Sequence, residues 1–305
     1  PKSLSEIRLS VHVLDKWILS RLSDTVRLSN QAFLHREFHR VTEAAYSFFY
    51  DSVCDVYLES IKPRLKGNTE DAELAASILF HCCETWLRLV FPIMPHLCDE
   101  LWHRIHCALG LQTDHDSLLV ASYPSESDWH PLRDEAIETN TLFALDVVGK
   151  IRSTKQSYGL KREHKVKASV LNSPIGTNWA EFADSISTLG ACEFLAANNK
   201  QHEEELVRKF SEVNAVRIPL DLRSDSQASG ELIIDVWSVL RPQEINKRLD
   251  SIKFDLERVE GKIKSRKFET VSSQRREKTL FKYQSLSKEL EQLELLLQRA
   301  NLKAR

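Results

Sequence analysis

The last 65 residues of the chain carry an apolar heptad pattern that a strongly basic segment interrupts. The first run is Ile245, Leu249, Ile252, Leu256, Val259 and Ile263, and the pattern resumes with Tyr283, Leu286, Leu290, Leu293 and Leu297. A helix with such a seam buries it against another helix, and the second run can fold back on the first. The pattern therefore predicts a C-terminal antiparallel coiled-coil hairpin over residues 241–305.

The tip of this predicted arm is cationic. Residues 262–278 hold only two acidic side chains, Glu269 and Glu277, against seven basic ones: Lys262, Lys264, Arg266, Lys267, Arg275, Arg276 and Lys278. Residues 241–305 carry a net charge of +7 in a chain whose net charge is −2, so the first 240 residues carry −9. A basic appendage on an acidic body indicates an arm that contacts a polyanion.

Helical spacing of apolar residues dominates the first half of the chain. It predicts helices over 11–34, 38–61, from 70 to Pro92, from Pro95 onward and over 132–157, joined by short connections. In the helix that begins at Pro95, we expect Leu97, Leu101 and Ile105 to face inward. Residues 118–123 read as an extended link. The fold class is therefore mainly α, with an antiparallel helical bundle over residues 1–158.

In residues 159–240 the apolar pattern changes from helical spacing to mostly alternating spacing, which predicts a small α/β connector. Alternating apolar residues indicate strands over 165–170, 191–195, 216–222 and 232–236, and a short helix lies near residues 179–189. Pro219 cannot donate a hydrogen bond to a neighbouring strand, so it places its strand at an edge of the sheet.

The sequence offers no catalytic constellation. It lacks G-x-S-x-G, H-E-x-x-H and G-x-x-x-x-G-K-[ST], and its eight glycines provide little material for a phosphate-binding loop. His103, His106 and Cys107 lie close together, but no matching pair supplies the rest of a metal site. No apolar run reaches the ~20 residues that cross a bilayer. We predict a binding or structural module with no catalytic residues, metal or membrane partner.

Several stretches of the chain share their wording with one known family. They are 15–22 (DKWILSRL), 26–33 (VRLSNQAF), 54–59 (CDVYLE) with Lys62-Pro63, 91–97 (FPIMPHL) with 100–102, Ile151-Arg152 followed by 158–160, and 258–268. These stretches resemble valyl-tRNA synthetases, especially their eukaryotic cytosolic forms. Isoleucyl and leucyl enzymes share the bundle but not the ending. The resemblance implies an anticodon-binding helical domain followed by a coiled-coil tRNA arm.

The resemblance also implies what the chain does not carry. In this family the nucleotide-binding signatures and the editing domain precede the bundle, and nothing here matches them. We therefore expect the C-terminal part of a class I valine–tRNA ligase, with ATP and Mg used by the parent catalytic domain and no cofactor in this chain. The implied partner is the valine-accepting tRNA, with other translation factors allowed. We expect a monomer in the cytoplasm, with the mitochondrion as the alternative.

A second basic cluster follows the bundle. Residues 150–167 hold one acid, Glu163, against Lys150, Arg152, Lys155, Lys161, Arg162, Lys165 and Lys167. Such a cluster meets backbone phosphates, which gives affinity without sequence choice. The predicted nucleic-acid-binding residues are Arg258, Lys262, Lys264, Arg266, Lys267, Arg275, Arg276 and Lys278 in the arm, with Lys150, Arg152, Lys155, Lys161 and Arg162 in this cluster. At Arg258 the resemblance implies a basic contact residue.

Two questions stay open at this point. Unpaired RNA bases stack on aromatic side chains, and the bundle offers Trp17, Phe33, Phe38 and Phe49, among which the sequence does not choose. Two alternative functions also remain: a coiled-coil module that binds a protein partner, and a free-standing synthetase paralogue that binds tRNA.

Overall fold

The chain is described from a computed structural model, and it is mainly α with a small mixed sheet, as predicted. The structure describes residues 1–67, 69–111, 117–171, 178–197, 200–212, 215–220, 230–236, 238–239 and 242–264, with 276, 279–280, 282–284, 286–287, 290–291, 294 and 297. The chain divides into two compact units. We call residues 1–148 and 175–190 the bundle unit, and residues 149–174 and 191–305 the sheet unit.

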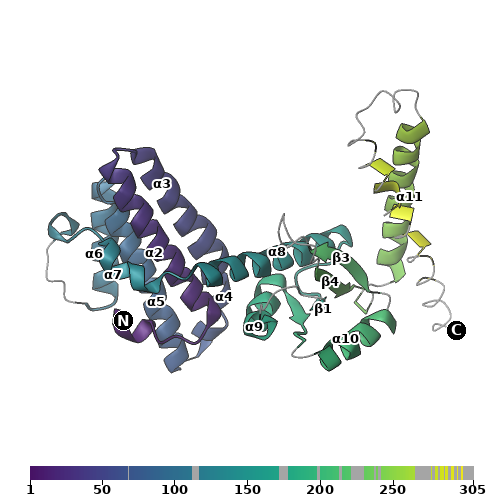
Figure 1. Cartoon of the computed structure of the whole chain (residues 1–305), viewed down its shortest axis with the longest axis horizontal. Helices are drawn as coiled ribbons and strands as arrows, with labels where there is room; N and C mark the ends of the chain where they lie inside the picture. Colours follow the sequence, from purple (N-terminus) through teal and green to yellow (C-terminus); the bar gives the residue numbers. More distant parts are fainter. Residues whose placement is uncertain are drawn as a thin grey trace. The chain divides into compact units, whose positions relative to one another are not determined.

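Long helices form the bundle unit, at the positions that the apolar spacing predicts. They are α2 (Val13–Leu34), α3 (Phe38–Tyr46), η1 (Ser47–Leu58), α4 (Glu59–Ile61), α5 (Glu70–Val90), α6 (Pro95–Ala108) and α8 (Glu135–Ser157), whose last residues belong to the sheet unit. The shorter elements are α1 (Leu4–Ile7), η2 (Arg64–Lys66), η3 (Leu118–Val120), α7 (Glu126–Trp129), η4 (His130–Leu132) and α9 (Trp179–Gly190). Figure 1 shows α2, α3 and α5 packed side by side.

Local chemistry explains where these helices begin and end. The hydroxyl of Thr69 accepts a hydrogen bond from the backbone N–H of Ala72 at 3.2 Å and caps α5. Pro95 occupies the first turn of α6, where its missing N–H costs nothing. The turn between α2 and α3 places Arg36 at φ 59°, a left-handed conformation more typical of glycine.

The middle of the predicted helix over 38–61 is a π-helix, η1, rather than an α-helix. The prediction of one continuous helix is confirmed, but its regular period is wrong between Ser47 and Leu58. Phe48, Val53 and Tyr57 are buried in η1, at separations of five and four residues. The wider π-helical turn brings side chains at this spacing onto one face.

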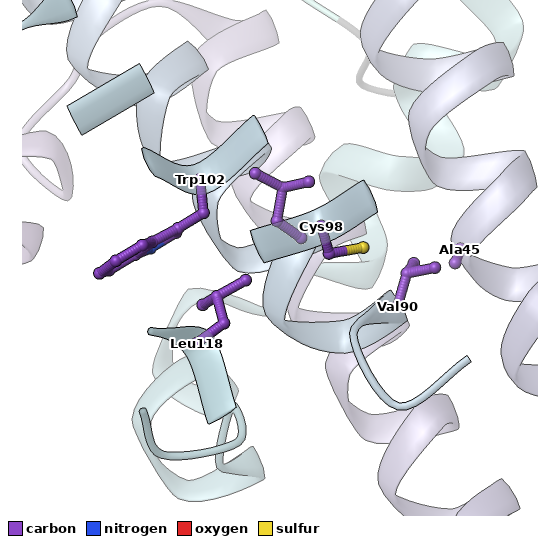
Figure 2. Close-up of a cluster of buried hydrophobic side chains, with 6 residues drawn as sticks. Ala45, Val90, Cys98, Trp102 and Leu118 are labelled. Carbon is purple, nitrogen blue, oxygen red and sulfur yellow. The ribbon is translucent and has the colours of Figure 1, made fainter. Parts of the chain in front are cut away.

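The inward face of α6 differs from the prediction at two of its three residues. Ile105 packs against the core, as predicted, but Leu97 and Leu101 do not. Cys98 and Trp102 are buried, whereas Leu97 and Leu101 are exposed at 52% and 37%. The apolar spacing fits either face of this helix, and the observed face lies one residue later. Figure 2 shows Trp102 and Cys98 in a cluster with Leu118, Val90 and Ala45. This cluster joins α6 to α5, α3 and η3.

Residues 118–120 form the short 3₁₀-helix η3 instead of the extended link that we expected. Asp99 on α6 fixes this turn, because its Oδ1 accepts hydrogen bonds from the Ser117 hydroxyl at 2.9 Å and the Leu118 N–H at 2.8 Å. The turn buries Leu118 and leaves Leu119 and Val120 exposed.

A buried carboxylate organises the N-terminal end of α2. Asp15 is fully buried and accepts hydrogen bonds from the hydroxyls of Ser10 at 2.7 Å and Tyr57 at 2.9 Å. Arg64 adds two more and reaches Asp71 at the same time. Burial and the neighbouring Asp15 raise the pKa of Tyr57 well above its usual value, so its hydroxyl remains a donor. The charge is therefore buried with its partners in place.

The sheet unit contains a four-stranded sheet in the order β2-β1-β4-β3. Its strands are β1 (Val166–Leu171), β2 (Cys192–Phe194), β3 (Val216–Leu220) and β4 (Gly230–Asp235). β1 pairs parallel with β2 and antiparallel with β4, which pairs antiparallel with β3. Pro219 lies on the edge strand β3, as predicted.

Helix α10 (Lys200–Glu212) has no counterpart among the predicted elements. The helix lies beside β1 and β4 (Figure 1). Its Leu206 and Phe210 pack against Leu171 of β1 and Ile233 of β4. The three consecutive acidic residues Glu203, Glu204 and Glu205 leave only a short apolar stripe in the sequence of this helix, so its spacing gives little sign of a helix.

The arm begins with helix α11 (Pro242–Lys264), and its apolar seam is buried at Leu249, Ile252 and Val259. Each described residue from 276 to 297 is helical, and Leu286 is buried. The ammonium of Lys253 lies 3.6 Å from the carboxylate of Glu294, which places the second run beside α11 at this point. The complete hairpin stays a prediction, because residues 265–275 lie outside the described part.

Candidate nucleic-acid interface

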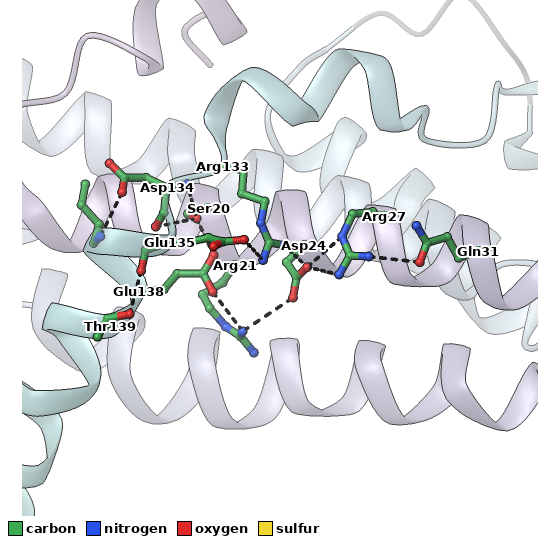
Figure 3. Close-up of polar contacts among 11 residues, drawn as sticks. Ser20, Arg21, Asp24, Arg27, Gln31, Arg133, Asp134, Glu135, Glu138 and Thr139 are labelled. Atoms are coloured by element: carbon green, nitrogen blue, oxygen red, sulfur yellow. Dashed lines mark hydrogen bonds and ion pairs between the residues drawn. The ribbon is translucent and has the colours of Figure 1, made fainter. Parts of the chain in front are cut away.

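Carboxylates already pair the basic side chains along one face of α2. Arg27 contacts Asp24 at 2.7 Å, Arg21 contacts Glu138 of α8 at 3.5 Å, and Arg133 also reaches Asp24. Figure 3 shows this polar network between α2 and the start of α8. Its cations hold the bundle together, so this face presents no surplus positive charge.

The surface of the second basic cluster consists of Arg152, Lys161, Arg162 and Lys165, which are all exposed. Arg152 lies in the C-terminal part of α8, and Lys161, Arg162 and Lys165 lie in the turn that leads into β1. Lys161 lies 3.8 Å from Glu163, and both side chains are more than 70% exposed. An exposed pair of this kind is weak, so the positive charge remains available to an anion.

Lys155 does not belong to this surface. Its side chain is only 5% exposed, and its ammonium donates to the carbonyl oxygens of Ala191 at 2.8 Å and Arg162 at 3.3 Å. Burial lowers its pKa. Lys155 therefore fastens the end of α8 to the loop before β1 and to the start of β2, and we leave it out of the interface.

Lys150 and Lys167 are also partly engaged. The Lys150 ammonium donates to the carbonyl oxygen of Pro219 at 3.4 Å. In the sheet, Lys167 of β1 stands in register with Glu193 of β2 and Asp235 of β4. Carboxylates on both neighbouring strands reduce the positive potential at Lys167.

In the arm, the structure places Arg258, Lys262 and Lys264 on exposed positions of α11. Lys264 contacts Glu260 at 2.6 Å, and this hydrogen bond raises the pKa of the lysine. Arg276 is half-buried and helical. The other predicted tip residues, Arg266, Lys267, Arg275 and Lys278, lie outside the described residues.

These basic surfaces can be interpreted once the family of the chain is known. A family model for the anticodon-binding domain of tRNA ligases matches residues 15–170, which is just over half of the chain. The chain belongs to this family. The match runs from α2 through α8 into β1, so it takes in the long helices of the bundle unit and the second basic cluster.

Individual relatives agree with this membership. The valine–tRNA ligase of Caenorhabditis elegans is 36% identical over 205 residues, which are 63% of this chain and 19% of that protein. The human valine–tRNA ligase is 40% identical over 153 residues, or 49% of this chain and 12% of that protein. The Fusobacterium nucleatum valine–tRNA ligase is 26% identical over 289 residues, or 90% of this chain and 29% of that protein. The chain therefore spans less than a third of the length of these relatives.

Neither a metal site nor a membrane-spanning helix is found in the part of the chain that the structure describes. His106 directs Nδ1 to the carbonyl oxygen of Trp102 at 2.8 Å, and His103 lies 3.9 Å from Asp99. Among the described residues, no group of three or more His, Cys, Asp and Glu side chains could hold a metal ion. None of their helices has the length and apolarity to cross a membrane.

Proposed function

We propose that this chain is the tRNA-binding part of a valine–tRNA ligase and that it holds the valine-accepting tRNA through two basic surfaces. The carrying observation is the exposed cluster of Arg152, Lys161, Arg162 and Lys165, inside the residues that match the anticodon-binding family. The arm, with Arg258, Lys262 and Lys264 exposed, is the second surface. Most cations of the bundle unit are bound to carboxylates, whereas these two surfaces each gather several exposed basic side chains.

The two surfaces suit the backbone of a folded RNA. Contacts between basic side chains and phosphates set affinity and orientation without reading sequence. An α-helix rises ~1.5 Å per residue, so the 23 residues of α11 extend over about 35 Å. This length suits an arm that braces a tRNA at a distance from the anticodon.

The test is the salt dependence of tRNA binding by the 305-residue chain, measured by filter binding with a transcript that carries a valine anticodon. Each phosphate contact contributes a slope of about −0.9 to log K against log salt. The double variant Lys161→Gln/Arg162→Gln should lose up to about two units of slope. Arg208→Gln/Lys209→Gln changes another exposed pair of basic residues, on α10, and is the matched control that should leave the slope unchanged.

Two results would contradict the proposal. Absence of tRNA binding by the unsubstituted chain favours the alternative of a coiled-coil module for a protein partner. Equal loss in the test and control variants means that the second basic cluster makes no particular contact and that only net charge matters.

The proposal extends to the activity and location of the parent protein. Valine activation with ATP and Mg would be carried out by the catalytic domain of the parent protein. Its place of work would be the cytoplasm, and relatives named as mitochondrial valine–tRNA ligases support the mitochondrion as the alternative. We further propose that the chain binds tRNA as a monomer.

A further inference from the structure

We propose that α3 and η1 carry a docking face for an arginine-rich segment of a protein partner. The face consists of the exposed side chains of Glu43, Tyr46, Tyr50, Asp51 and Asp55, and we call it the tyrosine–acid face. It lies in the bundle unit and contains no residue of the second basic cluster or of the arm. The inference therefore goes beyond tRNA binding and does not depend on it.

Two stacked tyrosines form the apolar part of this face. Tyr46 and Tyr50 are 62% and 53% exposed, and their ring planes are nearly parallel, at 10° to each other, with centroids 5.3 Å apart. Large apolar side chains gathered on a surface mark a site of interaction more often than single ones do. Tyrosine is also enriched among the residues that carry the binding energy of protein interfaces.

The π-helical winding of η1 brings the acidic side chains to the same side of the helix. Tyr50 and Asp55 are five residues apart, and in an α-helix only residues three and four apart share a face. The wider π-helical turn makes residues five apart neighbours, and such turns occur often at functional sites. The same winding buries Phe48 and Val53 on the inward side. It therefore sets the core and the tyrosine–acid face together.

The negative charge of the face is not neutralised within the described part of the chain. Glu43, Asp51 and Asp55 are exposed, and none of them pairs with a described basic side chain. Residues 41–61 contain four acidic residues and no Lys, Arg or His. The fourth acid, Glu59, pairs with Lys62 just beyond this range. The face thus differs from the exposed side of α2, where arginines and carboxylates bind one another.

This combination of rings and carboxylates fits arginine better than any other side chain. A guanidinium is planar, so it stacks on an aromatic face and donates two parallel hydrogen bonds to a carboxylate. A lysine ammonium supplies charge but neither the planar stack nor the paired hydrogen bonds. Unpaired carboxylates repel a phosphate backbone, so charge favours a basic protein segment over RNA at this face.

A groove on the neighbouring side of α3 offers room for the apolar side chains of such a segment. It has a volume of about 550 Å³, and its lining includes Leu28, Ala44 and the carboxylate of Glu43. Leu28 is 40% exposed there. Because Glu43 belongs to both the groove and the tyrosine–acid face, one bound segment can contact the two. Apolar contacts beside complementary charges are typical of protein interfaces.

A third exposed aromatic ring of α3 shows why charge decides the partner. Phe38 is 56% exposed, but its sequence neighbours Arg36 and Arg40 are exposed as well. These cations repel an arginine-rich segment. Aromatic exposure alone therefore does not define the docking face, and Phe38 provides a natural control for the two tyrosines.

The test measures the affinity of the 305-residue chain for a fluorescein-labelled oligo-arginine peptide and for an oligo-lysine peptide of the same length, by fluorescence anisotropy. The arginine peptide should bind several-fold more tightly, because its side chains stack on the tyrosine rings. Tyr46→Leu/Tyr50→Leu should raise the Kd for the arginine peptide about tenfold and remove this preference. Tyr46→Phe/Tyr50→Phe keeps both rings and should retain it.

Charge is tested separately from stacking. Asp51→Asn/Asp55→Asn should weaken the binding of both peptides and reduce its dependence on salt. Glu204→Gln/Glu205→Gln removes two exposed carboxylates from α10 and is the matched charge control, and Phe38→Leu is the matched aromatic control. Both controls should bind the peptides as the unsubstituted chain does. Thermal unfolding checks that each variant is folded, and the Asn pair decides the outcome if the Leu pair unfolds.

Three results would overturn the inference. Equal affinity of the unsubstituted chain for the two peptides means that the face does not recognise arginine. Equal loss in the acidic test and control variants means that only net charge matters. Loss of tRNA binding in Tyr46→Leu/Tyr50→Leu assigns the face to RNA instead. The proposed function is tested apart, because Lys161→Gln/Arg162→Gln should change tRNA binding and leave the preference for the arginine peptide intact.

Discussion

Arg64 donates two hydrogen bonds to the buried carboxylate of Asp15, from Nη1 to Oδ1 at 2.8 Å and from Nη2 to Oδ2 at 3.0 Å. The two residues are 49 positions apart, so this contact joins the start of α2 to the turn that follows α4. The guanidinium also reaches Asp71 of α5 at 2.7 Å. One side chain thus ties three segments of the bundle unit.

Removing that guanidinium should destabilise the chain strongly. Arg64→Met leaves the Asp15 charge buried with only two hydroxyl donors, and breaking a buried pair in this way costs about 3–5 kcal/mol. Urea unfolding measures the loss. Arg104→Met is the control, because Arg104 contacts Glu100 at 2.7 Å with both side chains mostly exposed, and its loss should stay below about 1 kcal/mol. Similar losses for the two variants would contradict the prediction.

Acid should weaken the same network. The hydrogen bond from Arg64 and then the charges of Arg64 and His12 lower the pKa of Asp71 below its ordinary 3.8. A carboxyl with a lowered folded-state pKa stabilises the fold above its unfolded pKa, and this stabilisation is lost as pH falls through the folded value. Unfolding free energy should therefore decline below about pH 4. Asp71→Asn should show a smaller decline, whereas the exposed Asp51→Asn should follow the unsubstituted chain.

The arm tip should contribute salt-dependent affinity for tRNA. Changing Lys264, Arg266, Lys267, Arg275 and Arg276 to Gln removes positive charge without shortening the side chains greatly, and each lost phosphate contact lowers the log–log salt slope by just under about one unit. The measurement is again filter binding across a salt series. A slope identical to that of the unsubstituted chain would show that the tip does not touch RNA.

The seam of α11 should decide whether the arm folds. Ile252 is fully buried, so Ile252→Glu places a carboxylate in an apolar seam and should cost at least about 2–5 kcal/mol of arm stability. Phe254→Glu, two residues away and 67% exposed, is the control and should be tolerated. Circular dichroism during heating measures both. A dimer in sedimentation that Ile252→Glu converts to a monomer would contradict an arm that folds within one chain.

Residue spacing predicts most of the helices because their apolar stripes are long and regular. It fails where two faces of a helix have similar patterns, as in α6, where Leu97 and Leu101 compete with Cys98 and Trp102. It fails again at η1, because apolar spacing alone does not distinguish a π-helical turn from an α-helical one. α10 escapes prediction because its anchoring apolar residues, Leu206 and Phe210, are few among charged ones.

The predicted interface shows the same limit. A run of lysines and arginines locates a basic segment, but it does not reveal that Lys155 turns inward to the carbonyl oxygen of Ala191. The roles of the bundle aromatics depend on burial, which only the packed helices define. Trp17 is buried and Phe49 is partly buried against Trp86, whereas Phe38 is exposed.

The division of the chain between its two units has a practical consequence for dissecting the protein. β1 pairs with both β2 and β4, yet it precedes α9, which belongs to the bundle unit. A fragment that begins at residue 191 would lose β1 from the middle of the sheet, and one that ends at residue 148 would lose α9. No single cut yields both units whole, so deletion series and limited proteolysis will report on the two together.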